Sequence, residues 1–292
     1  MSQTTLERMD ESMDLEEFYD ENKRRHIRLE RFWSFDEFVA SGKKYRHNKT
    51  CDDRRSEWQH GKWEQVDEWC REGWAPGVTA ALPIAESALK AMESDHALVN
   101  RFEPQWGMYG SQPDVGRYLQ GMPDDMIEFE PFVTSAAGKV VTLCSSFIYS
   151  GGIDGDVIIK RGDMVTALAM ALEQSQHSVE IWIDHTTERN GHIVSTKVLV
   201  KASDETLDAG MVAYRLAHPT ILRKIMFSHE FTWPAEVKRA QGVPGGMGMP
   251  TKPLENLPEG TIYLDHMLLG DRRLADPATF VTEKMKELGL IE

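Results

Sequence analysis

Residues 140–183 decide the fold of this chain, and they read VVTLCSSFIYSGGIDGDVIIKRGDMVTALAMALEQSQHSVEIWI. The apolar run at 140–144 predicts a buried strand, and the segment 155–176 carries apolar residues at helical spacing. The run 179–183 alternates between apolar and polar residues, as a strand does. A strand, a long helix and a second strand in series call for a right-handed crossover between parallel strands. We therefore predict that strands 140–143 and 179–183 are adjacent and parallel at the centre of a sheet.

The rest of the chain has the pattern of an α/β protein in which helices flank a mainly parallel sheet. Downstream we expect a strand at 192–201 after the Asn190-Gly191 turn, helices at 207–217 and 219–229, a loop at 240–260, a strand at 261–264 and a helix at 277–289. Upstream we expect helices at 14–31, 56–74 and 84–98, and an irregular connection rich in glycine and proline at 104–126. The predicted organisation is an acidic, disordered lead at 1–20, a mostly helical Trp-rich region at 21–130 and an α/β domain at 131–292.

Composition sets limits on the class of protein. The chain has 292 residues, of which 41% are hydrophobic and 27% are charged, so it can bury a substantial core. It has no apolar run of the roughly 18 residues that a membrane helix needs, and its acidic start is unlike a signal peptide. Its three cysteines form no CxxC pair, which favours a reducing compartment such as the cytoplasm. The net charge of −14 argues against binding to duplex DNA.

Several motifs occur in a recognisable order along the chain. They are SQPDVGRYLQGMPDDM at 111–126, VVTLCSSF at 140–147, RGDMVTALAMALEQSQHSVEIWI at 161–183 and LDAGMVAYRLAHPTILRKIMFS at 207–228. Together they resemble a family of tailed-phage and prophage proteins that carry a PDVGRYL motif. The element order after residue 138 resembles the von Willebrand factor A-like group of Rossmannoid domains. This resemblance implies a cytoplasmic protein of a bacterial host cell that uses its A-like domain for protein interaction.

The chain departs from metal-binding A-like domains at one place. Those domains carry Asp-x-Ser-x-Ser at the end of the first strand, where oxygen atoms hold Mg²⁺. Here residues 143–147 read Leu-Cys-Ser-Ser-Phe and contain no aspartate. The histidines show no H-x-x-x-H pair on a predicted helix, which favours hydrogen-bonded histidines over metal ligands. We therefore predict that no metal ion binds at this strand end and that the chain carries no cofactor.

Open α/β folds bind ligands beyond the carboxyl ends of their strands. The candidate side chains at this edge are Ser145 and Ser146 at the strand end, and Asp154 and Asp156 in the following loop. The serines lack a G-x-S-x-G pattern, and the loop lacks the G-x-G-x-x-G and G-K-[ST] patterns of phosphate sites. The simplest interpretation is a turn followed by a helix cap. A small-ligand site, or a hydrolase whose site matches no known pattern, is the alternative.

The PDVGRYL motif has two interpretations. Asp114 stands where it could cap a short helix, with Arg117 one turn further on. Alternatively, Arg117 and Tyr118 lie in a loop near the sheet and organise a binding site.

The segment 23–74 contains five of the eight tryptophans, interleaved with lysines and arginines. This composition is typical of platforms that stack the bases of a single strand and contact its phosphates. The candidate side chains are Trp33, Lys43, Lys44, Arg46, Arg54 and Arg55. The alternative is a set of core tryptophans with solvated charges around them, and we expect that outcome for Trp58 and Trp69.

The leading hypothesis is a binding or accessory protein without enzymatic activity, whose partner is another protein. The alternatives are a factor that binds single-stranded nucleic acid in phage transcription or replication, and a hydrolase. A protein partner is therefore expected, a single-stranded nucleic acid is the second candidate, and no membrane contact is expected.

Overall fold

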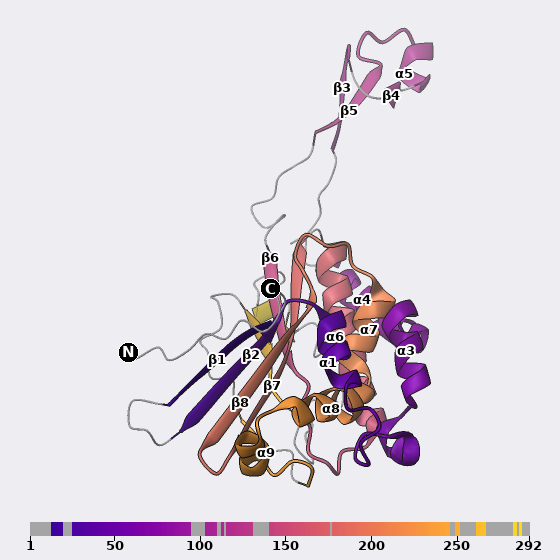
Figure 1. Ribbon diagram of the computed structural model, residues 1–292. Coiled ribbons are helices and arrows are strands. Elements are labelled where there is room, and N and C mark those ends of the chain that lie inside the picture. The colour runs from indigo at the N-terminus through magenta and orange to yellow at the C-terminus, as the bar shows by residue number, and fades with distance from the viewer. Residues whose placement is uncertain are drawn as a thin grey trace.

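The computed structural model describes residues 13–19, 25–94, 103–109, 112–113, 115–130, 140–175, 177–245, 249–251, 261–266, 283–284 and 286–287. Within these residues the chain forms a large sheet with helices packed on it, and a small second sheet (Figure 1). The predicted α/β class is confirmed. Helices flank the sheet, and the N-terminal region between residues 35 and 94 is largely helical. No helix in the described part of the chain is both long and apolar enough to cross a bilayer.

The large sheet has the strand order β1-β2-β8-β7-β6-β10, and β9 pairs with β7 beyond the point where β6 ends. Its strands are β1 Met13–Tyr19, β2 His26–Phe32, β6 Val140–Ser146, β7 Ser178–Arg189, β8 His192–Lys201, β9 Met249–Pro250 and β10 Ile262–Leu264. As predicted, β6 and β7 are adjacent and parallel, with Leu143 opposite Ile181. β10 continues the parallel pairing on the other side of β6, and β2 pairs in parallel with β8.

The hairpin between β7 and β8 turns at Asn190 and Gly191, and both residues have positive φ angles, of 52° and 75°. Two consecutive positive φ angles define the type of turn that suits the twist of antiparallel strands. The antiparallel hairpin expected from the Asn-Gly dipeptide is therefore present.

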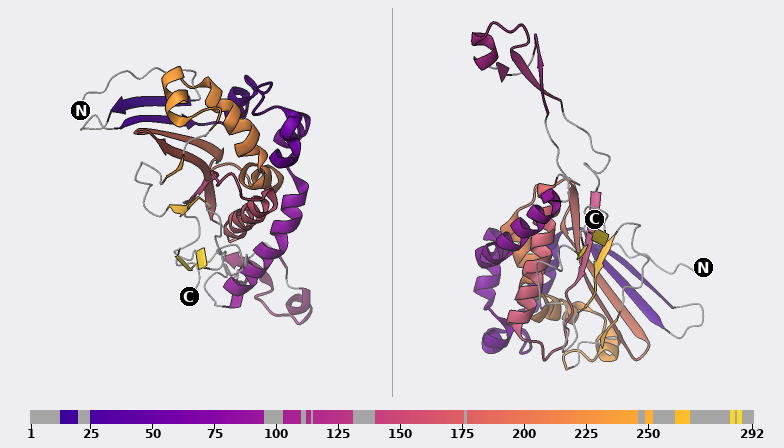
Figure 2. Two further views of the ribbon diagram at one scale, coloured as in Figure 1. Left: turned by 90° about the horizontal axis from the view of Figure 1, so that it is seen from below. Right: turned by 180° about the vertical axis from the view of Figure 1, so that it is seen from behind.

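The helices gather on one face of the large sheet (Figure 2). They are α1 Phe35–Lys43, α2 Ser56–Gln59, α3 Trp63–Glu72, α4 Ala75–Ser94, α6 Gly155–Gln174, α7 Ala209–Ala217, α8 Phe227–His229 and α9 Ala235–Gln241, with the short turns η1 Asp53–Arg55, η2 Ile221–Met226 and η3 Glu230–Thr232. The helix α6 makes the crossover from β6 to β7, and α4 and α7 pack against it. Every residue from Arg161 to Leu172 is buried. A helix that is buried all round in this way is the core of its domain.

The helices and strands on both sides of residue 130 share one hydrophobic core. Phe38 of α1 and Val66 of α3 belong to the same buried cluster as Leu168 of α6 and Ile183 of β7. The boundary that we expected near residue 130 therefore does not separate two cores.

The prediction of a helix at 14–31 is wrong, because this segment contains the antiparallel strands β1 and β2. The expected disorder of the lead is wrong for residues 13–19, which form β1. Its acidic first half and basic second half suit a helix dipole, but they suit a hairpin equally well. In the hairpin Asp14 lies opposite Arg31, and Glu17 lies opposite Arg28. Burial of β2 against β8 decides between the two structures.

The prediction of an irregular connection at 104–126 is also corrected. The segment contains the strands β3 Glu103–Gly107, β4 Gln112–Pro113 and β5 Met126–Glu130, which form the three-stranded sheet β3-β5-β4, and the short helix α5 Val115–Leu119. We call the described residues between 103 and 130 the arm; it is the labelled unit at the top of Figure 1. Gly121 and Pro123 lie in the connection between α5 and β5, whereas Pro104, Pro113 and Gly116 lie within the short elements.

The other expected elements are largely present, with shifted ends. The expected helix at 56–74 is broken into α2 and α3 at His60 and Gly61, and that at 219–229 consists of the π-helical turn η2 and α8. The described part of the expected loop at 240–260 includes β9 and the end of α9. Most of the expected helix at 277–289 lies outside the described residues.

Close packing of α6 on α7 generates a test of the fold. A Cβ atom at Gly162 would lie 2.0 Å from the Cα of Ala217, whereas a Cβ at Gly151 would meet nothing within 4 Å. Glycine to alanine normally stabilises a helix interior by about 1 kcal/mol. We expect Gly162→Ala instead to lower the free energy of unfolding by about 1–3 kcal/mol, because the helices must move apart. Urea unfolding measures the change, with Gly151→Ala as the control. Equal stability of Gly162→Ala and the wild type would contradict this packing.

Candidate functional site

The serines at the carboxyl end of β6 are buried, and the side chain of Arg161 binds the backbone beside them. Arg161 of α6 donates hydrogen bonds to the carbonyl oxygen of Ser146 (2.6 Å) and to those of Leu264 (3.0 Å) and Asp265 (2.6 Å). This side chain therefore ties the end of β6 to the end of β10. Ser145 and Ser146 are both buried, and within the described residues neither hydroxyl is hydrogen-bonded to a histidine. The arrangement supports the strand ends, and it lacks the serine–histidine pair that an activated nucleophile needs.

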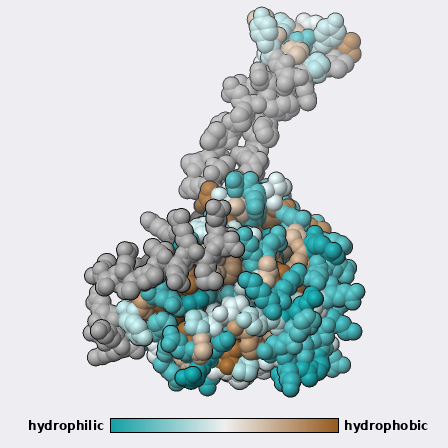
Figure 3. Space-filling view, in the orientation of Figure 1, coloured by the Kyte–Doolittle hydropathy of each residue, from teal (hydrophilic) through white to brown (hydrophobic). Residues whose placement is uncertain are grey.

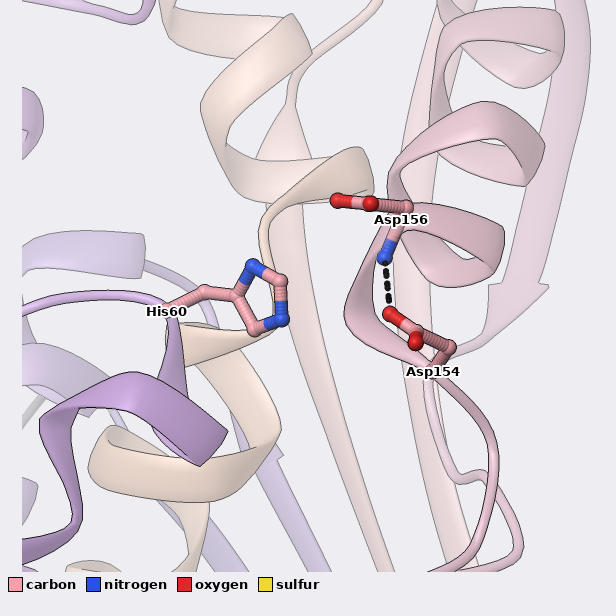
Figure 4. A group of neighbouring side chains, drawn as sticks. All are labelled: His60, Asp154 and Asp156. Carbon is pink, nitrogen blue, oxygen red and sulfur yellow. Dashed lines mark hydrogen bonds between the residues drawn. The ribbon is translucent and has the colours of Figure 1, made fainter.

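Asp154 and Asp156, at the start of α6, lie close to His60, a histidine that was not among the residues predicted from the sequence. Asp154 caps α6, because its Oδ1 accepts a hydrogen bond from the backbone N–H of Asp156 at 3.1 Å. His60, in the turn after α2, faces this cap (Figure 4). One nitrogen of His60 and one carboxylate oxygen of each aspartate all lie within 4.8 Å of one another. Candidate ligand atoms from two distant parts of the sequence therefore converge at the N-terminus of α6.

A buried arginine holds these two parts of the chain together. Arg223 of η2 donates hydrogen bonds of 2.6 Å to the carbonyl oxygen of Trp58, just before His60, and to that of Ile153, just before Asp154. Its guanidinium group also lies 4.4 Å from the centroid of the Trp58 ring. Its burial fixes the positions of both loops, because moving either loop would leave a buried guanidinium N–H without a partner.

Gly155, between the two aspartates, leaves room for the His60 ring in its observed position. A Cβ atom at Gly155 would lie 1.9 Å from the Nε2 of His60. The imidazole ring therefore lies directly against the first turn of α6.

A second group of ionisable side chains lies inside the core. The carboxylate of Glu30 accepts hydrogen bonds from Arg28 (2.8 Å), Thr196 (2.8 Å) and Trp233 (3.1 Å), and pairs with His229 (2.9 Å). Burial alone would raise the pKa of Glu30, but His229, Arg28 and Thr196 outweigh it and hold the pKa far below its ordinary value. Glu30 is therefore ionised and fully paired.

The neighbouring pair of His185 and Glu230 is buried but poorly satisfied. The His185 Nε2 and the Glu230 Oε1 are 3.7 Å apart, and neither side chain has a hydrogen-bond partner among the described residues. Burial, and then the charge of Glu30, raise the pKa of Glu230 well above its ordinary value. Burial, and then His229, lower the pKa of His185 to about 3. His185 is therefore neutral near pH 7, and burial favours the protonated, neutral form of Glu230.

The arm contains the PDVGRYL motif. Arg117 donates a hydrogen bond to the carbonyl oxygen of Asp124 (3.1 Å), and its guanidinium group lies 4.7 Å from the centroid of the Trp106 ring. Arg117 thus connects α5 to the loop before β5 and to β3. Tyr118 is exposed, and Asp114 lies outside the described residues.

The arm presents an unusual density of exposed apolar side chains. Between 44% and 83% of the surface of each of six residues is exposed: Trp106, Met108, Tyr109, Tyr118, Leu119 and Met122. Figure 3 shows apolar and weakly polar residues on the arm. We call the large sheet and its helices the body, and much of its visible surface is hydrophilic. The segment 103–130 also carries six acidic residues and one basic residue.

The tryptophans of 33–74 make contacts within the fold. Trp63 is buried, and Trp69 packs on His218 with ring centroids 4.3 Å apart. Trp58 is 37% exposed and stacks on Phe227, so the expectation that Trp58 lies in the core is wrong. Trp33 is the most exposed of them, at 47%, and its edge meets the Trp182 ring.

Two of the basic candidates of this region are paired with carboxylates, and the other three are exposed. Lys43 pairs with Asp67 at 2.5 Å, and Arg54 pairs with Asp52 at 2.5 Å. Lys44, Arg46 and Arg55 are exposed.

These features define a mixed α/β protein with one helix-covered sheet, a polar cluster at the N-terminus of its central helix and an apolar arm. The chain belongs to the family DUF7192, described as a domain of unknown function, whose model matches residues 6–292. The match spans both the body and the arm. Neither a curated protein nor a solved structure shows significant similarity to the chain.

The buried His185 predicts a pH dependence of stability. The unfolded chain protonates this histidine near pH 6.5, whereas the folded protein does so only near pH 3. The unfolded state therefore binds more protons between these values, and stability falls as the pH drops from 6.5 towards 3. At pH 5 the loss from His185 is about 2 kcal/mol. We expect His185→Phe to reduce the difference in unfolding free energy between pH 7 and pH 5 by about this amount.

Urea unfolding of both proteins at the two pH values measures the effect. The raised pKa of Glu230 acts in the opposite direction, but its causes are burial and Glu30, so it contributes similarly to both proteins. The exposed His47 provides the control variant, His47→Phe. An unchanged pH dependence in His185→Phe would show that this side chain is protonated in the folded state.

Proposed function

We propose that this protein is a non-enzymatic binding protein that engages a partner protein through its arm. The observation that carries the proposal is the group of six large apolar side chains exposed between residues 106 and 122. Single exposed apolar residues are ordinary, but a concentrated group on a small unit is typical of an interaction site. The motifs that resemble phage proteins add the expectation of an A-like accessory protein in the cytoplasm of a bacterial host.

The residue types of the arm support a protein partner. Tyr109 and Tyr118 are among the most exposed, at 83% and 67%, together with Leu119 at 78%. Tyrosine and tryptophan dominate the binding energy of protein interfaces, because their large rings bury much area at a low cost in conformational entropy. The contact between Arg117 and Trp106 joins α5, which carries Tyr118 and Leu119, to β3.

The charge of the arm indicates the chemistry of the partner. Acidic residues of the arm include Asp124 and Asp125 before β5, and Glu128 and Glu130 within it. An apolar centre beside acidic residues matches a partner with an apolar pocket and a basic rim. The same charge repels phosphates, so it disfavours a nucleic acid at this surface.

The alternatives receive less support from the site. A single-strand platform in 23–74 would need its aromatic rings and cations on one surface, but Trp63, Trp69 and Trp74 pack in or against the hydrophobic core. Lys43 and Arg54 also pair with carboxylates. A hydrolase would need an activated nucleophile, and the serines at the end of β6 are buried. We therefore place binding to a protein first.

The test begins with a photo-crosslinking amino acid at Tyr109, and at Val157 of α6 as a matched apolar control on the body. Each variant is expressed in native host cells, and a protein crosslinked only at Tyr109 is identified and purified. Calorimetry then measures its affinity for the wild type and for the Tyr109→Ser/Leu119→Ser double variant. We expect the double variant to bind at least about thirty-fold more weakly, since central interface residues each contribute about 2 kcal/mol or more. We also expect affinity to fall with salt, because acidic and basic groups meet.

Three results would contradict the proposal. The first is equal affinity of the captured protein for the wild type and the double variant. The second is self-association of the wild type through the arm, seen by analytical ultracentrifugation and lost in the double variant. The third is saturable, salt-sensitive quenching of tryptophan fluorescence by an oligonucleotide that Trp33→Ala abolishes, which would favour the nucleic-acid alternative.

A further inference from the structure

We infer that His60, Asp154 and Asp156 form a binding site for a divalent transition-metal cation of the class of Zn²⁺. The three candidate ligand atoms, one nitrogen and two oxygens, all lie within 4.8 Å of one another. Zinc binds such atoms at about 2.0–2.2 Å, so ligand atoms around one ion are about 3–4 Å apart. Small side-chain rotations therefore bring the three atoms onto a common centre (Figure 4).

The donor set indicates the kind of cation. Mg²⁺ and Ca²⁺ prefer sites made of oxygen atoms alone. An imidazole nitrogen beside two carboxylate oxygens is instead typical of zinc and its neighbours in the first transition series. Two negative charges also compensate the charge of a divalent ion. Asp154 and Asp156 are exposed and His60 is half-buried, so a cation can enter from solvent and keep water in its remaining positions.

The histidine distinguishes this group from a set of surface acids. It comes from a loop 94 residues earlier in the chain, yet its ring lies against Gly155, between the two aspartates. Arg223 holds that loop and the aspartate loop together through the carbonyl oxygens of Trp58 and Ile153. The fold therefore delivers the nitrogen and the oxygens to one place before a metal binds, which lowers the cost of ordering the ligands.

The site is distinct from the strand end at which the sequence predicts that no metal binds. That place is the end of β6, where Arg161 occupies the carbonyl oxygens. The new site is at the other end of the same connection, where α6 begins, and it is separate from the arm on which the proposed function depends.

The test is a calorimetric titration of the full chain with Zn²⁺. We expect one saturable site in the wild type. His60→Asn removes the imidazole but suits the positive φ of 61° at this position, because asparagine tolerates that conformation. Asp156→Asn removes one charge from an exposed side chain. We expect each variant to weaken binding at least ten-fold, because the loss of a ligand costs no less than the 10–100-fold that outer-shell partners contribute. The exposed His47 supplies the control, and His47→Asn is expected to bind as the wild type does.

A second measurement identifies the ligands. Co²⁺ is the probe, and its visible absorption is expected to report a nitrogen ligand in the wild type and to change in His60→Asn. Excess Mg²⁺ is expected not to displace Zn²⁺. Circular dichroism establishes that each variant is folded, and Asp156→Asn decides the matter if His60→Asn is not. Wild-type affinity in a folded His60→Asn or Asp156→Asn, or no saturable binding by the wild type below millimolar Zn²⁺, would overturn the inference.

Discussion

The buried carboxylate of Glu30 is the interaction on which the rest of the structure depends. A charge in the core is tolerated only when its oxygens are fully paired, and removing one partner of such a group costs about 3–5 kcal/mol. Here the partners are Arg28 on β2, Thr196 on β8, and His229 and Trp233 on the helical segment beyond η2. They can all reach Glu30 only when β2 lies beside β8 in one register and the helices cover that face. The requirement to pair one charge thus joins the N-terminal hairpin to the body of the protein.

Elements whose structure is set by nearby residues could be predicted from the sequence, and elements set by distant contacts could not. The strands β6 and β7 and the helix α6 were predictable, because their hydrophobic periods and the Asn190-Gly191 turn are local signals. The strands β1 and β2 were not, because their charge gradient suits both a helix and a hairpin. The contact that selects the hairpin is made with β8, more than 150 residues further along the chain. The arm was missed for a different reason: its strands are only two to five residues long, too short to show a period.

In the candidate sites, too, the residues with a local signal could be predicted and those placed by distant contacts could not. Asp154 and Asp156 could be selected from the sequence, because they stand in the loop between a predicted strand and a predicted helix. His60 could not, since the only local signal is the His60-Gly61 break between two short helices. What brings it to the aspartates is Arg223, which lies in the motif at 207–228, but that motif gives no sign that the side chain reaches both loops. In the arm, the sequence drew attention to Arg117 and Tyr118, but it contains no signal that the apolar side chains around them remain uncovered.

The parallel pairing of β2 with β8 has a consequence for how the protein is made. The side chains of Glu30 and Thr196 that meet in this pair are 166 residues apart. At a synthesis rate of about 5–20 residues per second, β2 leaves the ribosome on the order of ten to thirty seconds before its partner exists. Any strand that residues 26–32 form in that interval has an open edge, with backbone groups that another strand could pair with. Charged side chains on an edge strand disfavour such pairing, and this segment carries Arg28, Glu30 and Arg31.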